Sequence, residues 1–166
     1  MKKKIVCFIV LTIVVILSSC NLTENLIIEM DKKTFEVNRT YWNNQNMKNY
    51  QFTYDYFSSS GPLGPVTITI RENNETIIEN ENEFNQNIIA ESISEIFDFI
   101  SGTFDFIESV KNGSYFGHEI QKISLKIEYH SQYRFPTKVN LSTFYVKDVI
   151  GGAYYTLNIT DFKTIN

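Results

Sequence analysis

The fold is decided by the stretch Tyr50-Gln51-Phe52-Thr53-Tyr54-Asp55-Tyr56-Phe57, in which aromatic and polar side chains alternate. Successive side chains of a strand point to opposite faces, so a period of two predicts a half-buried β-strand. Tyr50, Phe52, Tyr54 and Tyr56 share one parity and would form an aromatic sheet face. We expect this face to pack under a helix as core; the alternative is an open cleft that binds a peptide or lipid.

The regions that follow repeat this pattern between turn signals. Ser58-Ser59-Ser60-Gly61-Pro62 predicts a turn, after which two more strands would complete an antiparallel meander. Three further alternating runs lie toward the C-terminus, and the first two are joined by the hairpin-sized link His130–Tyr133. The strands predicted after the first are Val66–Ile70, Thr76–Glu79, Ile123–Tyr129, Arg134–Ser142 and Tyr154–Phe162.

Two helical segments accompany these strands. Asp31 is a suitable N-cap for a helix over Lys32–Lys48, although the run Asn43–Asn46 favours an early end. Ser92-Ile93-Ser94-Glu95 matches the capping box S-x-x-E, and apolar residues at helical spacing follow it. We expect Gly102 to break or kink this second segment. The predicted fold class is α+β: an antiparallel sheet of about six strands, with an N-terminal helix and a central helical segment packed on one face.

The N-terminal region, Met1–Cys20, has the three parts of a secretory signal peptide: lysines, an apolar run and small residues. The apolar run Ile5–Leu17 is too short for a comfortable transmembrane helix. Leu17-Ser18-Ser19-Cys20 resembles the lipobox of bacterial lipoproteins. That resemblance implies signal cleavage between Ser19 and Cys20, and lipidation of the Cys20 thiol. The alternative is a plain signal peptide with an incidental cysteine.

This interpretation divides the chain into residues 1–19 as a lipoprotein signal peptide, 20–31 as a lipidated tether and 32–166 as a single α+β domain. It predicts localisation at the cell membrane or outer membrane, lipid-anchored on the exported face. The bilayer would be a partner through acylated Cys20. Each buried methylene contributes about 0.8 kcal/mol, so two or three acyl chains would anchor the protein durably.

The composition indicates one folded domain, because 166 residues with 43% hydrophobic side chains are enough for one core. Two Cys exclude a disulfide scaffold, and no thiolate metal site would remain, since Cys7 would be removed with the signal peptide and Cys20 acylated. The net charge is −4, with 15 basic side chains, three of them in Lys2–Lys4, against 19 acidic ones. This balance gives no basic signature for nucleic acid. We therefore expect no nucleic-acid partner, no metal and no cofactor.

Three groups of side chains could carry chemistry, and each is better explained as solvated surface. The spacing does not bring the two histidines together, and the acidic run lacks the glycine-punctuated pattern of a calcium loop. The helical carboxylate pair fits the outer polar face of a helix. No P-loop, Rossmann fingerprint, nucleophile elbow or His-Glu-x-x-His motif is present. The candidates are, in that order, His118 and His130 with Glu119 and Glu128 nearby; Glu79, Glu81 and Glu83; and Asp98 and Asp105.

Several short motifs, in order along the chain, resemble the bacterial lipoproteins grouped as domain-of-unknown-function family 6174. The opening W…NYxFxY pattern, the start of the central helix, a Y…P-T hairpin and the last strand each have a counterpart. The resemblance implies a single fold unit and the lipoprotein class, and carries no activity with it. The segments are Trp42 with Asn49–Tyr54, Ile93–Asp98, Ile127–His130 with Tyr133–Val139, and Tyr155–Phe162.

The expected function is that of a membrane-anchored envelope lipoprotein whose domain is a non-enzymatic binding or interaction module. Besides the bilayer, its partner would be an unknown protein or small ligand. The candidate binding face comprises Tyr54 and Tyr56 from the first strand, with Tyr133 and Pro136 from the later hairpin. One alternative is an envelope-assembly or inhibitor-like protein that acts by contact through the open face of the sheet. Another is a hydrolase, for which the sequence offers no nucleophile–base pair or metal cluster.

Overall fold

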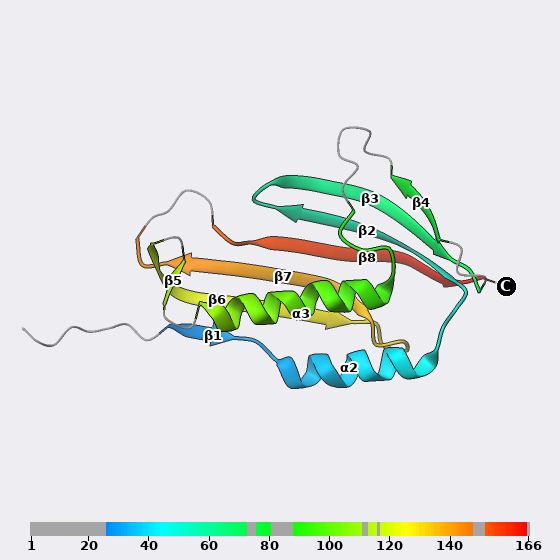
Figure 1. The fold of residues 1–166 in the computed structure, drawn as a ribbon, viewed down its shortest axis with the longest axis horizontal. Helices are drawn as coiled ribbons and strands as arrows, with labels where there is room; N and C mark the ends of the chain where they lie inside the picture. Colours follow the sequence, from blue (N-terminus) through cyan, green and yellow to red (C-terminus); the bar gives the residue numbers. More distant parts are fainter. Residues whose placement is uncertain are drawn as a thin grey trace, which may run out of the picture.

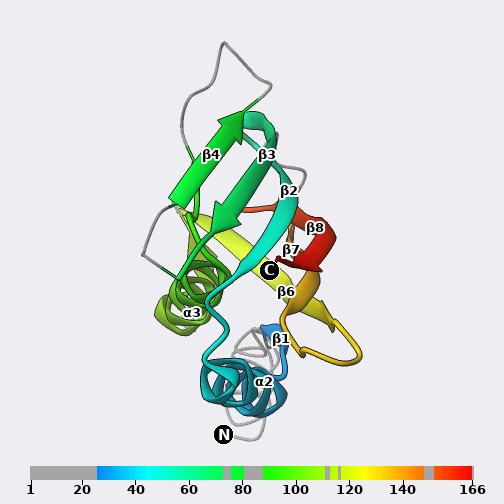
Figure 2. The same ribbon diagram turned by 90° about the vertical axis from the view of Figure 1, so that its right-hand side faces the viewer.

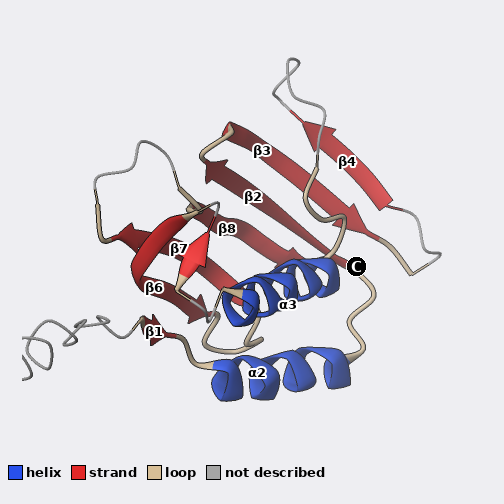
Figure 3. Ribbon diagram, turned by 60° about the vertical axis from the view of Figure 1, so that its left-hand side comes forward, coloured by secondary structure: helices blue, strands red, loops and turns tan. Residues whose placement is uncertain are grey.

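The computed structural model describes residues 26–72, 76–80, 88–110, 113–115, 117–147 and 152–165. Figure 1 shows a twisted sheet with the strand order β1-β6-β7-β8-β2-β3-β4, and β5 pairs with β6 beside this path. Two helices within the described residues lie on one side of the sheet (Figure 3). The elements are β1 Ile27–Glu29, α2 Lys32–Gln45, β2 Tyr50–Ser58, β3 Gly61–Ile70, β4 Thr76–Asn80, α3 Ile93–Ser109, β5 Ser114–Tyr115, β6 His118–Tyr129, β7 Pro136–Tyr145 and β8 Tyr155–Thr164.

The mixed fold with a mostly antiparallel sheet is confirmed, but the prediction of about six strands is wrong. The strand triplets β2-β3-β4 and β6-β7-β8 form the two halves of the sheet, joined by the antiparallel pair β8 and β2. The additional strands are β5, two residues long, and β1, which pairs in parallel with β6. Strand β1 lies within residues 20–31, which we assigned to the tether. Three residues cannot show a periodic pattern, so a strand this short is recognisable only through its distant partner.

Helix α3 runs without interruption through Gly102, so the predicted break or kink at this position is wrong. A glycine in a helix interior costs about 1 kcal/mol relative to alanine. Against that, α3 buries seven side chains on one face, and each large apolar one contributes about 1.5–3 kcal/mol. Burial along this face therefore outweighs the single weak position. The buried residues are Ile93, Ile96, Phe97, Ile100, Thr103, Phe104 and Ile107.

Helix α2 begins where the Asp31 carboxylate accepts a hydrogen bond from the Thr34 amide at 2.9 Å. It ends at Gln45, because Asn46 adopts a left-handed conformation, which confirms the early end expected from the asparagine run. Figure 2 shows α3 against one side of the sheet and α2 next to β1, at the β1 edge of the sheet. The helices meet through Phe35, whose ring lies 4.9 Å from that of Phe104.

The core lies between α3 and the sheet. Tyr50, Phe52 and Tyr54 are fully or almost fully buried, which confirms the core packing predicted for this part of the aromatic face. Val66 and Ile68 of β3 extend the same buried face. Neither helix among the described residues is both long and apolar enough to cross a membrane. The core thus holds α3 against the sheet. A ligand-binding site would therefore form near the ends of the strands, outside the core.

Pro136 occupies a position that its missing N–H allows. It is the first residue of β7, opposite Tyr129, where the register between β6 and β7 shifts. Proline is tolerated at the first residue of a strand or at a bulge, and Pro136 meets both conditions. Beyond the shift, residues 138–141 of β7 pair with both β6 and β8.

Candidate functional site

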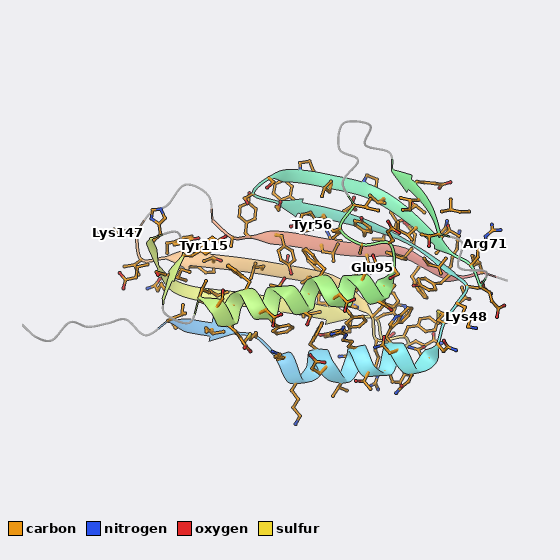
Figure 4. The ribbon with its side chains drawn as sticks, in the orientation of Figure 1. Lys48, Tyr56, Arg71, Glu95, Tyr115 and Lys147 are labelled. Carbon is orange, nitrogen blue, oxygen red and sulfur yellow. The ribbon has the colours of Figure 1, made fainter. Side chains whose placement is uncertain are left out.

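A groove of about 520 Å³ lies between the C-terminal half of α3 and the ends of β2 and β8. Its volume is within the range of small-molecule sites in proteins. Six aromatic side chains line it, together with hydroxyl groups from Thr103 and the turn Ser58–Ser60. Figure 4 labels two of the aromatic residues, Tyr56 on β2 and Tyr115 on β5. We call this site the aromatic groove; its aromatic residues are Tyr56, Phe99, Phe106, Tyr115, Tyr154 and Tyr155.

One wall of the aromatic groove is a cluster of three rings from three different elements. The ring centroids of Phe99 and Tyr155 are 5.1 Å apart, and Tyr56 lies 5.7 Å and 5.6 Å from them. The Tyr155 hydroxyl is 2.8 Å from the Thr103 hydroxyl, in a buried hydrogen bond that ties β8 to α3. Ring pairs at these separations are attractive, so the wall is formed without a ligand.

Burial shapes the electrostatics of this wall. Desolvation raises the pKa of Tyr155 well above its ordinary value, although the hydrogen bond with Thr103 acts in the opposite direction. Desolvation also raises the pKa of Tyr56, against a smaller effect of Ser58. Both phenols therefore stay neutral at physiological pH and offer hydroxyl groups rather than charge.

Gly102 leaves open space on the helical side of the groove. A Cβ built at this position would meet no atom within 4 Å. Its neighbours one turn away along α3, Phe99 and Phe106, both line the groove, so a side chain at position 102 would occupy the same space. Glycine lowers the stability of the helix and has no side chain to make contacts here. The absence of a side chain widens the groove.

The only carboxylate among the described lining residues is already paired. Asp98 forms an ion pair with Arg39 of α2, and its side chain is largely exposed. The lining contains no Lys, Arg or His among the described residues. With neutral phenols, serines and apolar rings, the aromatic groove suits an apolar group that carries hydroxyl or other neutral polar atoms.

The structure separates the four residues proposed as a binding face. Tyr56 lines the aromatic groove, whereas Tyr54 is fully buried and its hydroxyl accepts a hydrogen bond from the Ile89 amide at 3.1 Å. Pro136 is buried at the start of β7, the opposite end of the sheet from the groove. Tyr133 lies near it, 5.1 Å from the ring of Phe162. Tyr56 is thus the member of this set that a ligand in the groove could touch.

The histidines also lie at opposite ends of β6. His130 has a structural role, since its Nδ1 accepts hydrogen bonds from the amides of Gln132 and Tyr133, each at 3.2 Å. Its ring stacks on Phe135 with centroids 4.9 Å apart. His118 begins β6 at the groove end. In the part of the chain that the structure describes, no three His, Cys, Asp or Glu side chains meet as a metal site would require.

The remaining candidates are solvent-facing or lie outside the described residues. Asp105 is exposed on α3, and Glu79 is exposed on β4. The rest of the acidic run, Glu81 and Glu83, falls outside the described residues, as do Ser19 and Cys20. The lipobox prediction therefore stays a prediction.

Most of the aromatic groove was missed from the sequence. A second apolar stripe on the central helix could have revealed part of it: Phe99 and Phe106 are seven residues apart, with Gly102 between them, and lie beside the buried stripe. A glycine between two aromatic residues on one helix face signals a gap. No feature of the sequence indicated that Tyr56 of β2 and Tyr155 of β8 would line the same groove.

Comparison with known proteins places the chain in a family. It matches DUF6174, a family of unknown function, over residues 34–163. No curated protein and no solved structure shows a significant match. The matched segment begins in α2 and ends in β8, so it includes both helices and the aromatic groove. The chain therefore belongs to the DUF6174 family.

Proposed function

We propose that this protein is an envelope lipoprotein, anchored through acylated Cys20, whose folded domain binds a ligand in the aromatic groove. The domain acts by binding, without catalysis. The lipobox residues Leu17–Cys20 support the anchor, and the aromatic groove supports the binding role. The ligand would be a small molecule, or an apolar side chain of a partner protein, that presents a ring or branched group.

The observation that carries this proposal is the open space at Gly102 beside a preformed aromatic wall. Gly102 is exposed, and the open space in front of it lies beside the apolar rings that line the groove, so an apolar ligand could occupy it. Glycine at this position lowers the stability of the helix relative to alanine, and it makes no side-chain contacts. Binding of an apolar group against Tyr56, Phe99 and Tyr155 would explain why the helix has glycine at position 102.

Substitution of Gly102 tests the groove directly. Gly102→Trp should fill the space and weaken binding of a neutral fluorescent naphthalene derivative, N-phenyl-1-naphthylamine, by at least about tenfold, which is about 1.4 kcal/mol. Gly102→Ala is the matched control: it adds only a methyl group, restores helix propensity and should bind the probe like the wild type. Equal binding by Gly102→Trp and the wild type would exclude the aromatic groove as the site.

The anchor is tested separately by metabolic labelling with palmitate. The wild-type chain should incorporate label and partition with membranes, whereas Cys20→Ala should do neither. Two or more acyl chains are needed for durable attachment, so loss of the thiol should release the protein from the membrane. Continued labelling of Cys20→Ala would show that the lipobox interpretation is wrong.

A further inference from the structure

We propose that one end of the sheet, where β2 and β7 finish and where β1, β6 and β8 begin, lies against the lipid bilayer. This inference rests on the anchor at Cys20 given under the proposed function. It adds a second, non-covalent contact: exposed apolar side chains of the folded domain that enter the interfacial region of the membrane.

Exposed apolar residues are concentrated at this end. Eight large hydrophobic side chains are exposed among the described residues, and five of them lie here. The register places all five near the same end of the sheet, since Ser58 pairs with Tyr155, Ile120 with Tyr145 and Ile27 with Lys122 (Figure 1). We call these five residues the apolar end: Ile27, Phe57, Phe144, Val146 and Tyr154.

The strand pattern turns three of these side chains away from the helices. Val139 and Leu141 of β7 are buried, so Phe144, three residues beyond Leu141, lies on the opposite, outer face. Ile27 shares the cross-strand row of Phe144, through Lys122. Phe57 lies on the same face, in the row of Thr156 and Asn140. These side chains are about half exposed, at 51%, 52% and 49% respectively.

The same outer face also carries hydroxyl and amide groups. The Thr156 hydroxyl, in the row of Phe57, donates to the Asn140 side chain at 2.9 Å. Farther along β2 and β3, Thr53 and Thr67 join their hydroxyls at 2.9 Å. These polar side chains satisfy one another within the sheet, whereas the exposed phenylalanine, isoleucine and valine side chains near the strand ends cannot form such bonds. Exposed aromatic and aliphatic groups gathered in this way mark an interaction surface, and aromatic rings favour the membrane interface.

The path of the chain identifies the bilayer as the partner. Leu26, the first described residue, leads into β1 at the apolar end. Cys20 precedes Leu26 by six residues, which can span at most about 20 Å even when fully extended. Acyl chains on Cys20 would therefore hold the apolar end within about 20 Å of the membrane. Strand β4, at the other edge of the sheet from β1, is not held near the membrane by this short connection.

The charges at this end favour an apolar contact over an electrostatic one. Lys122, in the row of Ile27 and Phe144, is paired with Glu29 at 2.7 Å. The exposed Lys147 and Glu119 line one small hollow at this end, so their opposite charges balance. The chain as a whole has a net charge of −4, so it gains nothing from an anionic surface. We therefore expect the contact to form on zwitterionic lipid and to be insensitive to salt. The aromatic groove shares Tyr154 with the apolar end, so its ligand would enter beside the lipid surface.

Depth measurements on the lipidated, processed chain test this contact. Cys20 would be acylated and Cys7 removed with the signal peptide, so an introduced cysteine provides the free thiol for a fluorophore. Phe57→Cys and Phe144→Cys report on the apolar end, while Tyr41→Cys on α2 and Ile78→Cys on β4 replace exposed hydrophobic residues elsewhere. In phosphatidylcholine vesicles with spin-labelled headgroups, fluorescence at positions 57 and 144 should fall by half or more, and at the control positions hardly at all.

The outcomes separate the two proposals. A chain that fails to float with the vesicles contradicts the anchor, and thus the proposed function. A chain that floats, yet is quenched equally at positions 57, 144, 41 and 78, overturns the apolar contact while the anchor stands. Quenching that disappears at high salt also overturns it, because the contact would then be electrostatic. Thermal unfolding of each labelled variant verifies that the domain is folded.

Discussion

At the scale of single residues, Gly64 has the tightest backbone constraint of the described glycines on the strands. Its φ is +101°, and a Cβ would lie 2.8 Å from the Tyr54 carbonyl oxygen. Gly64→Ala should therefore lower the free energy of unfolding by about 2–3 kcal/mol, from a strained φ and a backbone clash together. Urea denaturation followed by circular dichroism measures this difference.

Gly61 provides a matched control in the same strand. Its φ is +104°, but a Cβ there would meet no atom within 4 Å. Gly61→Ala should cost about 1 kcal/mol, since only the conformational strain remains. If both variants lose the same free energy, the close approach to Tyr54 is not what requires glycine at position 64.

The tyrosines of β2 show how far residue-level patterns reach. Alternation correctly predicted that Tyr50 and Tyr54 face the core. It could not show that Tyr56 is only half-buried, although Tyr56 keeps the same parity and pairs with the buried Leu157 of β8. Tyr56 lies where the open space at Gly102 of α3 leaves the sheet face partly uncovered, so it forms a wall of the aromatic groove. Coverage by a helix depends on tertiary packing, which a period of two in one segment does not record.

At the scale of elements, the start of α3 depends on its capping box. The Ser92 hydroxyl accepts a hydrogen bond from the Glu95 amide at 3.1 Å, and the Glu95 carboxylate accepts one from the Glu91 amide at 2.8 Å. Ser92→Ala should lower the free energy of unfolding by about 1 kcal/mol, because an amide at the helix start loses its partner. Ser92→Thr keeps the hydroxyl and should remain close to the wild type in chemical denaturation. An equal loss in both variants would mean that packing, and not capping, is responsible.

Elements were predictable where local signals were strong. The capping box located α3, and the asparagine run located the end of α2. The prediction at Gly102 failed because a propensity of about 1 kcal/mol was weighed without the burial that opposes it. Strand β1 was missed because its three residues are defined by a parallel partner nearly a hundred residues away. The local sequence predicts a helix or strand only when its local signals outweigh the contacts that the segment makes with distant residues.

At the scale of the whole molecule, the aromatic groove depends on contacts between distant segments. Tyr56, Phe99 and Tyr155 come from β2, α3 and β8, and no motif in the sequence connects them. The order of the strands, which brings β8 beside β2, creates the site. The apolar end arises in the same way, from the first or last residues of several strands. Neither the aromatic groove nor the apolar end could therefore be predicted without the order of the strands in the sheet.

The buried tyrosines give the whole fold a predictable response to alkali. Desolvation raises the pKa of Tyr50 to about 12, and it also raises the pKa values of Tyr54, Tyr129 and Tyr155. In the unfolded chain these phenols ionise near pH 10. Between pH 10 and 12 the unfolded chain thus releases protons that the folded chain retains, and the free energy of unfolding falls as pH rises.

Each such tyrosine should contribute a slope approaching about 1.4 kcal/mol per pH unit in this range, and none below it. Urea denaturation at pH 8, 10 and 11 should show stability that is constant at first and then declines steeply. Tyr50→Phe should reduce the decline, because it removes one proton from the difference between the states. Tyr154→Phe, at a position 41% exposed, serves as the control. A decline unchanged by Tyr50→Phe would show that its burial does not contribute to the alkaline unfolding.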